Sequence, residues 1–243
     1  MRIRCDVVCE TGKVRSNNED MALVFGEQVR DSALSFTCDT GDGIRFVAAV
    51  ADGMGGHADG EVASNMATSS FNEFLVALPD GLDTEEVVKA VKQWGADVSS
   101  QMKAAARGSG MGCTFCGLFT YDEQVYVLNV GDSRLYRLRY GLFKQLTTDH
   151  SERVRQNDPT LPSNLIYNAL GLDDVFVDVT PTRMVDGDKY LICSDGLTDM
   201  VEGAEIGSLV RAEDCSARLL VEAALAAGGA DNVTVILLGV SCE

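Results

Sequence analysis

The sequence predicts an α+β fold in which antiparallel β-sheets form a sandwich and helices pack on its outside. Strand-like segments follow one another through tight turns, which is typical of antiparallel sheets. Two long helical segments come in succession instead of one after each strand, and this argues against a doubly wound parallel sheet. No linker-like or low-complexity stretch divides the 243 residues, so we expect a single domain over residues 1–243.

The first half of the chain is expected to form four strands and then two helices. Alternation and β-branched content predict the strands at 3–9, 21–25, 34–38 and 44–51. From Gly60 apolar residues recur at three-to-four spacing until Pro79, which predicts an amphipathic helix. A second helix is expected from Thr84 to Ala106, because acids lie at its start and the basic residues Lys103 and Arg107 lie at its other end.

The second half returns to strands and contains one helix. The strands are expected at 113–120, 124–130, 134–139, 174–179, 188–193 and 232–240. A helix is expected from Glu213 to Ala227, where paired glycines end it. Residues 151–170 are polar and irregular and lie between two candidate ligand segments, so we expect a mobile flap there.

Charge and hydropathy exclude several classes of partner. The formal net charge is −17, which argues against nucleic-acid backbones and anionic membranes. No apolar run approaches the ~20 residues of a membrane span. The segment Met1–Val8 alternates like a strand and lacks the apolar core of a signal peptide, so a cytoplasmic location is expected.

The eight cysteines are expected to be mainly buried, reduced thiols. Six of them lie in apolar, strand-like contexts: Cys5, Cys9, Cys38, Cys113, Cys116 and Cys193. One Cys-x-x-Cys occurs, formed by Cys113 and Cys116, and no second pair matches it. A zinc site at that pair is therefore the less favoured alternative.

Aspartates recur at the ends of apolar strands. Asp52 and Asp195 each follow a strand and precede a glycine, and Asp231 opens the last strand. One Asp-Gly pair alone is more simply a solvated turn, so the prediction depends on their co-occurrence. Because carboxylates repel one another, their convergence has a physical use around a hard divalent cation. The sequence therefore predicts a metal-dependent enzyme.

Further acids and one arginine extend this set. Asp132 lies in a tight turn between two strands, and Asp199 would point the same way as Asp195 if a helical turn joins them. Oxygen donors with almost no histidine favour Mg²⁺ or Mn²⁺ over Zn²⁺ or Cu²⁺. Two such ions could activate a water and clamp a phosphoryl oxygen. Arg15 could bind the phosphate, or it could instead pair with Glu19.

These segments closely resemble the metal-dependent protein serine/threonine phosphatases of type 2C in their compact bacterial form. The matching segments, in chain order, are Arg15-x-x-Asn-Glu-Asp20, Ala51-Asp-Gly-Met-Gly-Gly-His57, Gly60-Glu-x-Ala-Ser64, Gly110-Met-Gly-Cys-Thr114, Asn129-Val-Gly-Asp-Ser-Arg134, Leu146-Thr-x-Asp-His-Ser151, Leu170-Gly171, Ser194-Asp-Gly-Leu-x-Asp199 and Asp231-Asn-Val-Thr234. The resemblance implies a four-layer αββα sandwich, with two antiparallel sheets flanked by antiparallel helix pairs.

The resemblance also implies a binuclear Mn²⁺ or Mg²⁺ centre. Asp52 would bridge the two ions, and the Gly53 carbonyl would bind one of them. Asp195 and Asp231 would be further ligands of the pair.

The remaining roles that the resemblance implies lie around this pair. Glu19 and Asp20 would hold waters on the ions, and Arg15 would bind the substrate phosphate. Asp132 and Asp199 would be ligands of a third, weaker ion.

The implied reaction hydrolyses phosphoserine and phosphothreonine on proteins with a metal-activated water and no phosphoenzyme intermediate. The substrates would be targets of a serine/threonine kinase, and the protein would act as a monomer. Met54 occupies the position where the eukaryotic pattern has histidine, so the general acid is either His57 or a water.

Parts of the sequence are also compatible with two other functions. The same scaffold could be a non-catalytic pseudophosphatase that docks or regulates. The segment Gly53–Ala58 also fits a dinucleotide-binding pattern, with Glu73 twenty residues on. In that pattern the acid ends a second parallel strand, whereas Glu73 falls in a predicted helix.

Overall fold

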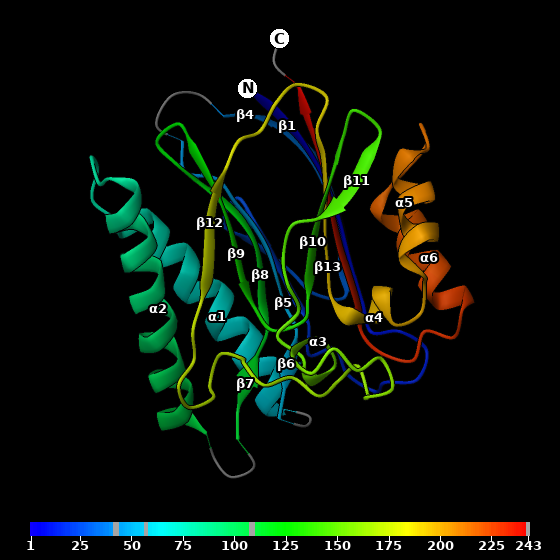
Figure 1. Cartoon of the computed structure of the whole chain (residues 1–243), viewed down its shortest axis with the longest axis horizontal. Coiled ribbons are helices and arrows are strands. Elements are labelled where there is room, and N and C mark those ends of the chain that lie inside the picture. The colour runs from blue at the N-terminus through cyan, green and yellow to red at the C-terminus, as the bar shows by residue number, and fades with distance from the viewer. Residues whose placement is uncertain (41–43, 56–57, 107–109, 242–243) are drawn as a thin grey trace.

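Two antiparallel sheets pack face to face between two layers of helices in the computed structural model (Figure 1). The structure describes residues 1–40, 44–55, 58–106 and 110–241. The four-layer αββα sandwich expected from the sequence is confirmed.

The first sheet contains the N-terminal and the C-terminal strands side by side. Its order is β11-β10-β13-β14-β1-β4. The bounds are β1 Arg2–Glu10, β4 Ser32–Asp39, β10 Arg134–Arg139, β11 Leu142–Gln145, β13 Lys189–Cys193 and β14 Val233–Ser241. Strand β14 pairs with both β1 and β13, so the N-terminal and C-terminal strands are neighbours inside this sheet.

The second sheet has the order β12-β9-β8-β5-β2-β3. Its bounds are β2 Met21–Val24, β3 Glu27–Val29, β5 Val47–Ala51, β8 Phe115–Tyr121, β9 Gln124–Val130 and β12 Asp178–Thr182. A separate two-stranded ladder joins β6 Gly53–Met54 to β7 Gly112–Cys113. This ladder holds the segment after Asp52 against the start of β8.

Helices cover the outer face of each sheet. Those over the second sheet are α1 Ala58–Ala77 and α2 Thr84–Ala105, and those over the first are α5 Gly203–Arg211 and α6 Ala217–Ala226. Two single turns, α3 Glu152–Arg155 and α4 Asp195–Thr198, lie at the end of the sandwich where Asp52 follows β5. Asp83 and Glu86 form a reciprocal capping box that starts α2.

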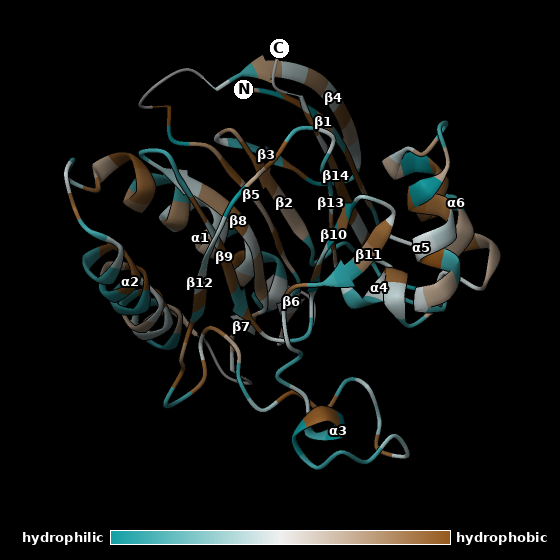
Figure 2. Cartoon of the chain, turned by 45° about the horizontal axis from the view of Figure 1, so that its top comes forward, coloured by the Kyte–Doolittle hydropathy of each residue, from teal (hydrophilic) through white to brown (hydrophobic). Residues whose placement is uncertain are grey.

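Apolar side chains form three cores between the four layers, which are two sheets and two layers of helices. One core lies under α1 and α2, where Phe71 meets Trp94 edge-on at 4.8 Å between ring centroids. A second lies between the two sheets around Phe46 and Tyr190, and a third lies under α5 and α6 around Leu220. The hydropathy colouring shows apolar residues concentrated in the central strands, as this layering requires (Figure 2).

Several boundaries differ from the sequence prediction. The strand expected at 174–179 begins at Asp178, and the helix expected at 213–227 spans Ala217–Ala226. The short elements β3, β6, β11 and α5 were missed. Helix α5 opens on Gly203 and contains Gly207, so its propensity is low, and packing of Ile206 and Val210 on the first sheet forms it.

The structure also decides two alternatives. Cys113 belongs to the core under the helices and Cys116 to the core between the sheets, so the two thiols do not form a zinc site. Glu73 lies within α1 and α2 follows, so the second parallel strand of a dinucleotide site does not occur there. Cys242 lies outside the described residues. None of the described helices is both long enough and apolar enough to cross a membrane.

Candidate metal centre

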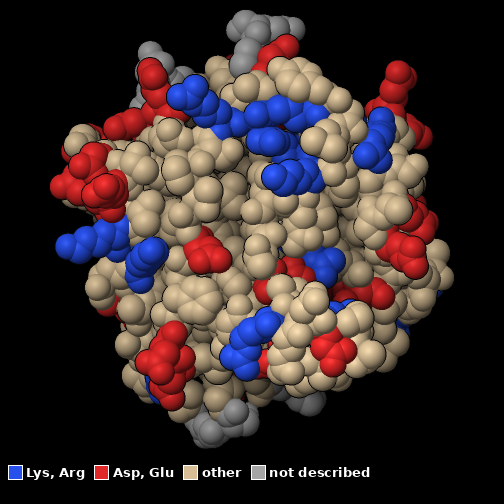
Figure 3. Space-filling model, in the orientation of Figure 1, with Lys and Arg blue, Asp and Glu red and all other residues tan. Residues whose placement is uncertain are grey.

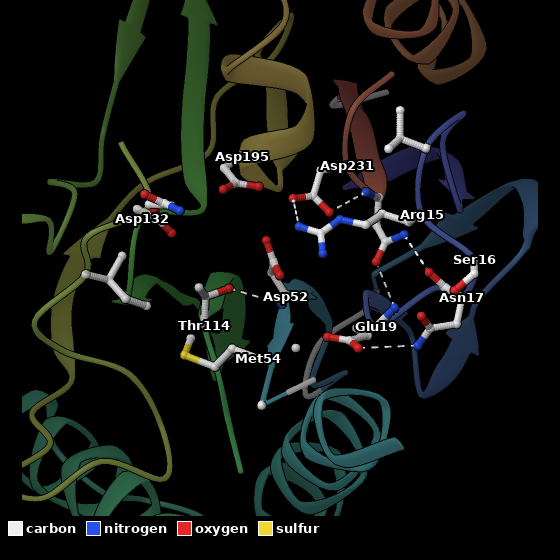
Figure 4. A pocket seen from close by; sticks show the side chains of 16 residues that line it. Arg15, Ser16, Asn17, Glu19, Asp52, Met54, Thr114, Asp132, Asp195 and Asp231 are labelled. Atoms are coloured by element: carbon white, nitrogen blue, oxygen red, sulfur yellow. Dashed lines mark hydrogen bonds and ion pairs between the residues drawn. The ribbon is translucent and has the colours of Figure 1, made fainter. Parts of the chain in front are cut away.

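A pocket of about 510 Å³ opens at one end of the sandwich, where several strands end (Figure 4). Seven of the predicted site residues line it: Arg15, Glu19, Asp52, Gly53, Asp132, Asp195 and Asp231. Asn164 and Ile166 of the expected flap form part of its wall. Asp20 lies behind the pocket, fully buried, and Asp199 lines a small adjoining cavity.

Asp52 is held by the strands on either side of it. Its amide donates to Thr114 Oγ1 at 3.0 Å, and its carbonyl accepts from the Thr114 amide at 2.9 Å. Thr114 Oγ1 also lies 2.7 Å from Ser133 Oγ, beside Asp132. One buried hydroxyl pair therefore connects the segments that carry Asp52 and Asp132.

Asp52 and Asp195 are each followed by a glycine, because another segment of the backbone approaches both positions closely. A Cβ on Gly53 would lie 2.2 Å from the Gly60 carbonyl oxygen and 2.6 Å from that of Glu19. A Cβ on Gly196 would lie 1.9 Å from the Asn232 carbonyl oxygen. Both contacts are with backbone and cannot yield, so these glycines let distant acidic segments meet.

Asp195 and Asp231 meet through this second contact. Asp195 begins α4, and the Asp199 amide donates to its carbonyl at 2.7 Å, which is the helical turn that the spacing of the two acids required. Asp231 Oδ1 accepts from the Asn232 amide at 2.8 Å, and Oδ2 accepts from Arg15 Nη2 at 2.7 Å. Arg15 thus pairs with Asp231, and the alternative pairing with Glu19 is wrong.

Asp20 contributes a carboxylate oxygen that lacks a partner. Its Oδ2 accepts from Ser194 Oγ at 2.8 Å and from Thr234 Oγ1 at 2.7 Å, whereas its buried Oδ1 accepts no hydrogen bond within the described residues. Leaving such an atom unpaired is costly, and a nearby ion or ordered water is its usual explanation.

The acids of this centre carry more negative charge than the protein compensates. Burial, and then the charges of the neighbouring aspartates, raise the pKa of Asp52 well above its usual range. Burial is also the main cause that raises the pKa of Asp195 to about 6, of Asp20 to about 7 and of Asp132 to about 8. A divalent cation would reverse these shifts by favouring the charged forms.

The donor set fits Mn²⁺ or Mg²⁺. The pocket offers carboxylate and carbonyl oxygens, and no cysteine or histidine is among the described residues that line it. Across the described part of the chain, no three His, Cys, Asp or Glu side chains are already gathered as ligands of one ion. Each ion would therefore complete its shell with water, as Mg²⁺ commonly does.

The small adjoining cavity lies between the flap and two of the predicted acids. Asp132 and Asp199 both line it, together with Asp195. Ser163 of the flap donates from Oγ to Asp199 Oδ2 at 2.8 Å. A cation bound there would compete with this hydrogen bond for Asp199.

Residues to which the sequence assigned no role hold these segments in place. His150 is buried, and its Nδ1 accepts a hydrogen bond from the Gly131 amide at 3.1 Å. The same Nδ1 lies 2.8 Å from Asn168 Nδ2. On the other side of the ring, Nε2 lies 3.1 Å from Asp178 Oδ2. Asn232 Oδ1 accepts a hydrogen bond from the Glu19 amide at 2.9 Å. Each of these residues stands next to a predicted acid or inside a matching segment, and that position was the available signal. The predicted His57 lies outside the described residues.

The sequence of the chain is similar to those of known protein phosphatases. A family model described as protein phosphatase 2C matches residues 24–225. The chain is 31% identical to a serine/threonine phosphatase, Stp, of Listeria innocua, over 94% of this chain and 92% of that protein. It is also 31% identical to the serine/threonine protein phosphatase PstP of Mycobacterium tuberculosis, over 95% of this chain and 44% of that protein.

Solved structures show the same fold. The crystal structure of the Mycobacterium tuberculosis phosphatase PstP superimposes with a TM-score of 0.80 at 30% identity, over the whole length of both chains. The catalytic domain of PstP in complex with two manganese ions superimposes with a TM-score of 0.78, also at 30% identity over both whole chains.

Proposed function

The chain belongs to the protein phosphatase 2C family of metal-dependent protein phosphatases, and we propose that it hydrolyses phosphoserine and phosphothreonine at a binuclear Mn²⁺ or Mg²⁺ centre. The observation that carries the proposal is the convergence of buried and half-buried carboxylates, with only one arginine beside them, in one open pocket. Such a set serves to bind cations that in turn bind a phosphate ester.

We assign the ions to the residues that the pocket brings together. Asp52 would bridge the pair with the Gly53 carbonyl beside it, and Asp195 and Asp231 would complete the protein ligands. The ions would supply the positive charge that lowers the pKa of water and neutralises phosphoryl oxygens.

The outer acids would support this pair. Glu19 and Asp20 would accept hydrogen bonds from water molecules on the two ions. Asp20 Oδ1 has no other hydrogen-bond partner within the described residues. Asp132 and Asp199 would hold a third, weaker ion in the adjoining cavity.

The protein's own groups favour direct attack by water. Thr114 Oγ1 is already engaged by the Asp52 amide and by Ser133, so its hydroxyl is not available as a nucleophile. Ser16 is exposed at the rim, and no histidine or cysteine among the described lining residues could activate it. The absence of a phosphoenzyme intermediate is therefore part of the proposal. The leaving oxygen would receive its proton from His57 or from water.

Arg15 would bind the phosphate. Its side chain is 55% exposed and lies between Asp231 and Asp52 in the pocket (Figure 4). Within the described residues it makes one hydrogen bond, so the rest of its planar fork can receive phosphate oxygens.

We expect Arg15→Ala to act mainly by raising KM, because it removes phosphate binding in the ground state as well as in the transition state. Loss of a hydrogen bond to a charged group predicts a fall in kcat/KM of roughly 10- to 100-fold. Steady-state kinetics on a phosphothreonine peptide measures it. Lys13→Ala, which removes an exposed charge two residues away, is the matched control. Unchanged kcat and KM in Arg15→Ala would place the phosphate elsewhere.

The function is tested by hydrolysis of p-nitrophenyl phosphate and of a phosphothreonine peptide with Mn²⁺, with and without chelator. The proposal expects turnover that needs the metal and returns when it is restored. A protein that binds Mn²⁺ fully but hydrolyses neither substrate would instead be a pseudophosphatase with a docking role.

The proposed substrates are phosphorylated proteins, the targets of a serine/threonine kinase, and the chain is proposed to act as a monomer.

A further inference from the structure

The hairpin of β10 and β11 carries a group of basic side chains, two of which form no ion pair within the described residues. Three basic side chains share one face of this hairpin, Arg137, Arg139 and Lys144, which we call the basic edge. Figure 3 shows Lys and Arg gathered over the part of the face where Figure 1 draws these strands. In a chain of net charge −17, such a cluster is unexpected.

Two of these cations stand directly opposite each other. Arg137 pairs in register with Lys144 across the antiparallel strands. Cβ atoms of such pairs lie about 4.5–5.5 Å apart, and like charges in this position are destabilising. Neither side chain forms an ion pair within the described residues, and the buried Arg137 Nε has no hydrogen-bond partner there.

The buried acid that contacts the basic edge, Asp188, already has several hydrogen-bond donors. Asp188 accepts from Arg139 Nε and Nη2, both at 2.7 Å, and from Tyr190 Oη at 3.0 Å and the Val185 amide at 2.9 Å. It therefore neutralises Arg139 and has little capacity left for Arg137. The basic edge keeps two unpaired cations at a cost in stability, which is typical of sites that bind a ligand.

Charge complementarity defines that ligand. A guanidinium fork and an ammonium group side by side bind carboxylates well. Most of the remaining surface of this acidic chain repels a negatively charged peptide, so the basic edge is where one would be held.

The basic edge lies within reach of the catalytic pocket. Strand β10 begins two residues after Asp132, which lines the pocket, and Arg137 follows five residues after Asp132. At about 3.4 Å per residue the two are roughly 17 Å apart along the strand. An extended substrate segment of about five or six residues spans that length.

We propose that the basic edge docks an acidic segment of the phosphoprotein substrate while the phosphorylated side chain occupies the pocket. The inference rests on the proposed phosphatase function and adds a substrate class: phosphoproteins with Asp or Glu residues about five or more positions from the phosphorylated residue.

Paired phosphothreonine peptides test this directly. One peptide carries four glutamates beyond a spacer of about six Gly and Ser residues, its match carries four glutamines, and both are made with the tract on either side of the phosphothreonine. The quantity compared is the ratio of kcat/KM for the glutamate peptide to that for the glutamine peptide. It is measured for the wild type, for Arg137→Gln with Lys144→Gln, and for Lys89→Gln with Lys92→Gln on the exposed face of α2 as a control of equal charge change.

We expect a wild-type ratio of about five or more for one tract orientation, since two exposed ion pairs together contribute at this level. The ratio should fall to about one in the basic-edge variant, persist in the α2 control and decrease with salt. Arg137→Gln should also leave the thermal midpoint unchanged or raised, because it removes a like-charge pair.

Three results would overturn the docking proposal: no preference in the wild type for either orientation, a preference that survives in the basic-edge variant, or an equal loss in the α2 control, which would indicate net charge alone. Failure of the phosphatase function has a different signature, because wild-type protein would then not hydrolyse p-nitrophenyl phosphate with Mn²⁺. Wild-type turnover without glutamate preference would refute the docking alone.

Discussion

Asp52→Asn is expected to abolish phosphatase activity, lowering kcat by a factor on the order of 10³ or more. The amide keeps the shape of the side chain but loses the charge, and the proposed bridging position needs an anionic oxygen toward each ion. Mn²⁺ affinity should fall together with kcat. Kinetics on p-nitrophenyl phosphate and calorimetric titration with Mn²⁺ measure the two effects.

The same variant has a second expected signature. Because burial, and then the charges of the neighbouring aspartates, disfavour a charged Asp52, the metal-free Asp52→Asn protein should be more stable than the metal-free wild type near pH 8. Asp122→Asn is the matched control, since Asp122 lies in an exposed hairpin turn at φ 49°, a conformation that Asn also adopts. Near-normal turnover in Asp52→Asn would refute the bridging assignment.

Stability without metal is expected to fall as the pH rises from about 5 to about 8. The pKa values of Asp195, Asp20 and Asp132 are raised in the folded protein to about 6, 7 and 8, from an ordinary value of 3.8. Between those limits the folded protein holds protons that the unfolded chain has already lost. The free energy of unfolding therefore decreases through this window and recovers below it.

Bound Mn²⁺ should oppose this trend. Because the ion binds the charged carboxylates, its binding releases protons and strengthens as the pH rises. The increase in thermal midpoint on adding Mn²⁺ should be larger at pH 8 than at pH 6, as measured by scanning calorimetry with chelator or with Mn²⁺. A metal-free midpoint that rises with pH over this range would contradict the assignment of these acids to one uncompensated centre.

The sequence was sufficient to predict that Asp52, Asp195 and Asp231 would gather in one pocket, because each of them lies at the end of a strand and the fold brings these ends together. It also showed the glycines after Asp52 and Asp195, but a turn was the simplest interpretation of each. Only the structure reveals that Gly196 lies against the Asn232 backbone, a contact between segments 36 residues apart in the sequence.

Other features depend on contacts that no local pattern encodes. The unpaired Oδ1 of Asp20 follows from the positions of Ser194 and Thr234, which lie 174 and 214 residues away in the chain. Arg15 was expected to contact phosphate or Glu19, and its partner Asp231 lies 216 residues away. Helix α5 was missed for a related reason, since its glycines disfavour a helix locally and packing on the first sheet compensates.

The central claim is that the aspartates of this pocket bind a pair of divalent cations. Anomalous diffraction from crystals grown with Mn²⁺ tests it most directly. The account predicts two strong peaks about 3.5–4 Å apart between Asp52, Asp195 and Asp231, with a weaker third near Asp132 and Asp199. Fully loaded crystals with no anomalous peak in the pocket, or with peaks only at other acids, would contradict it.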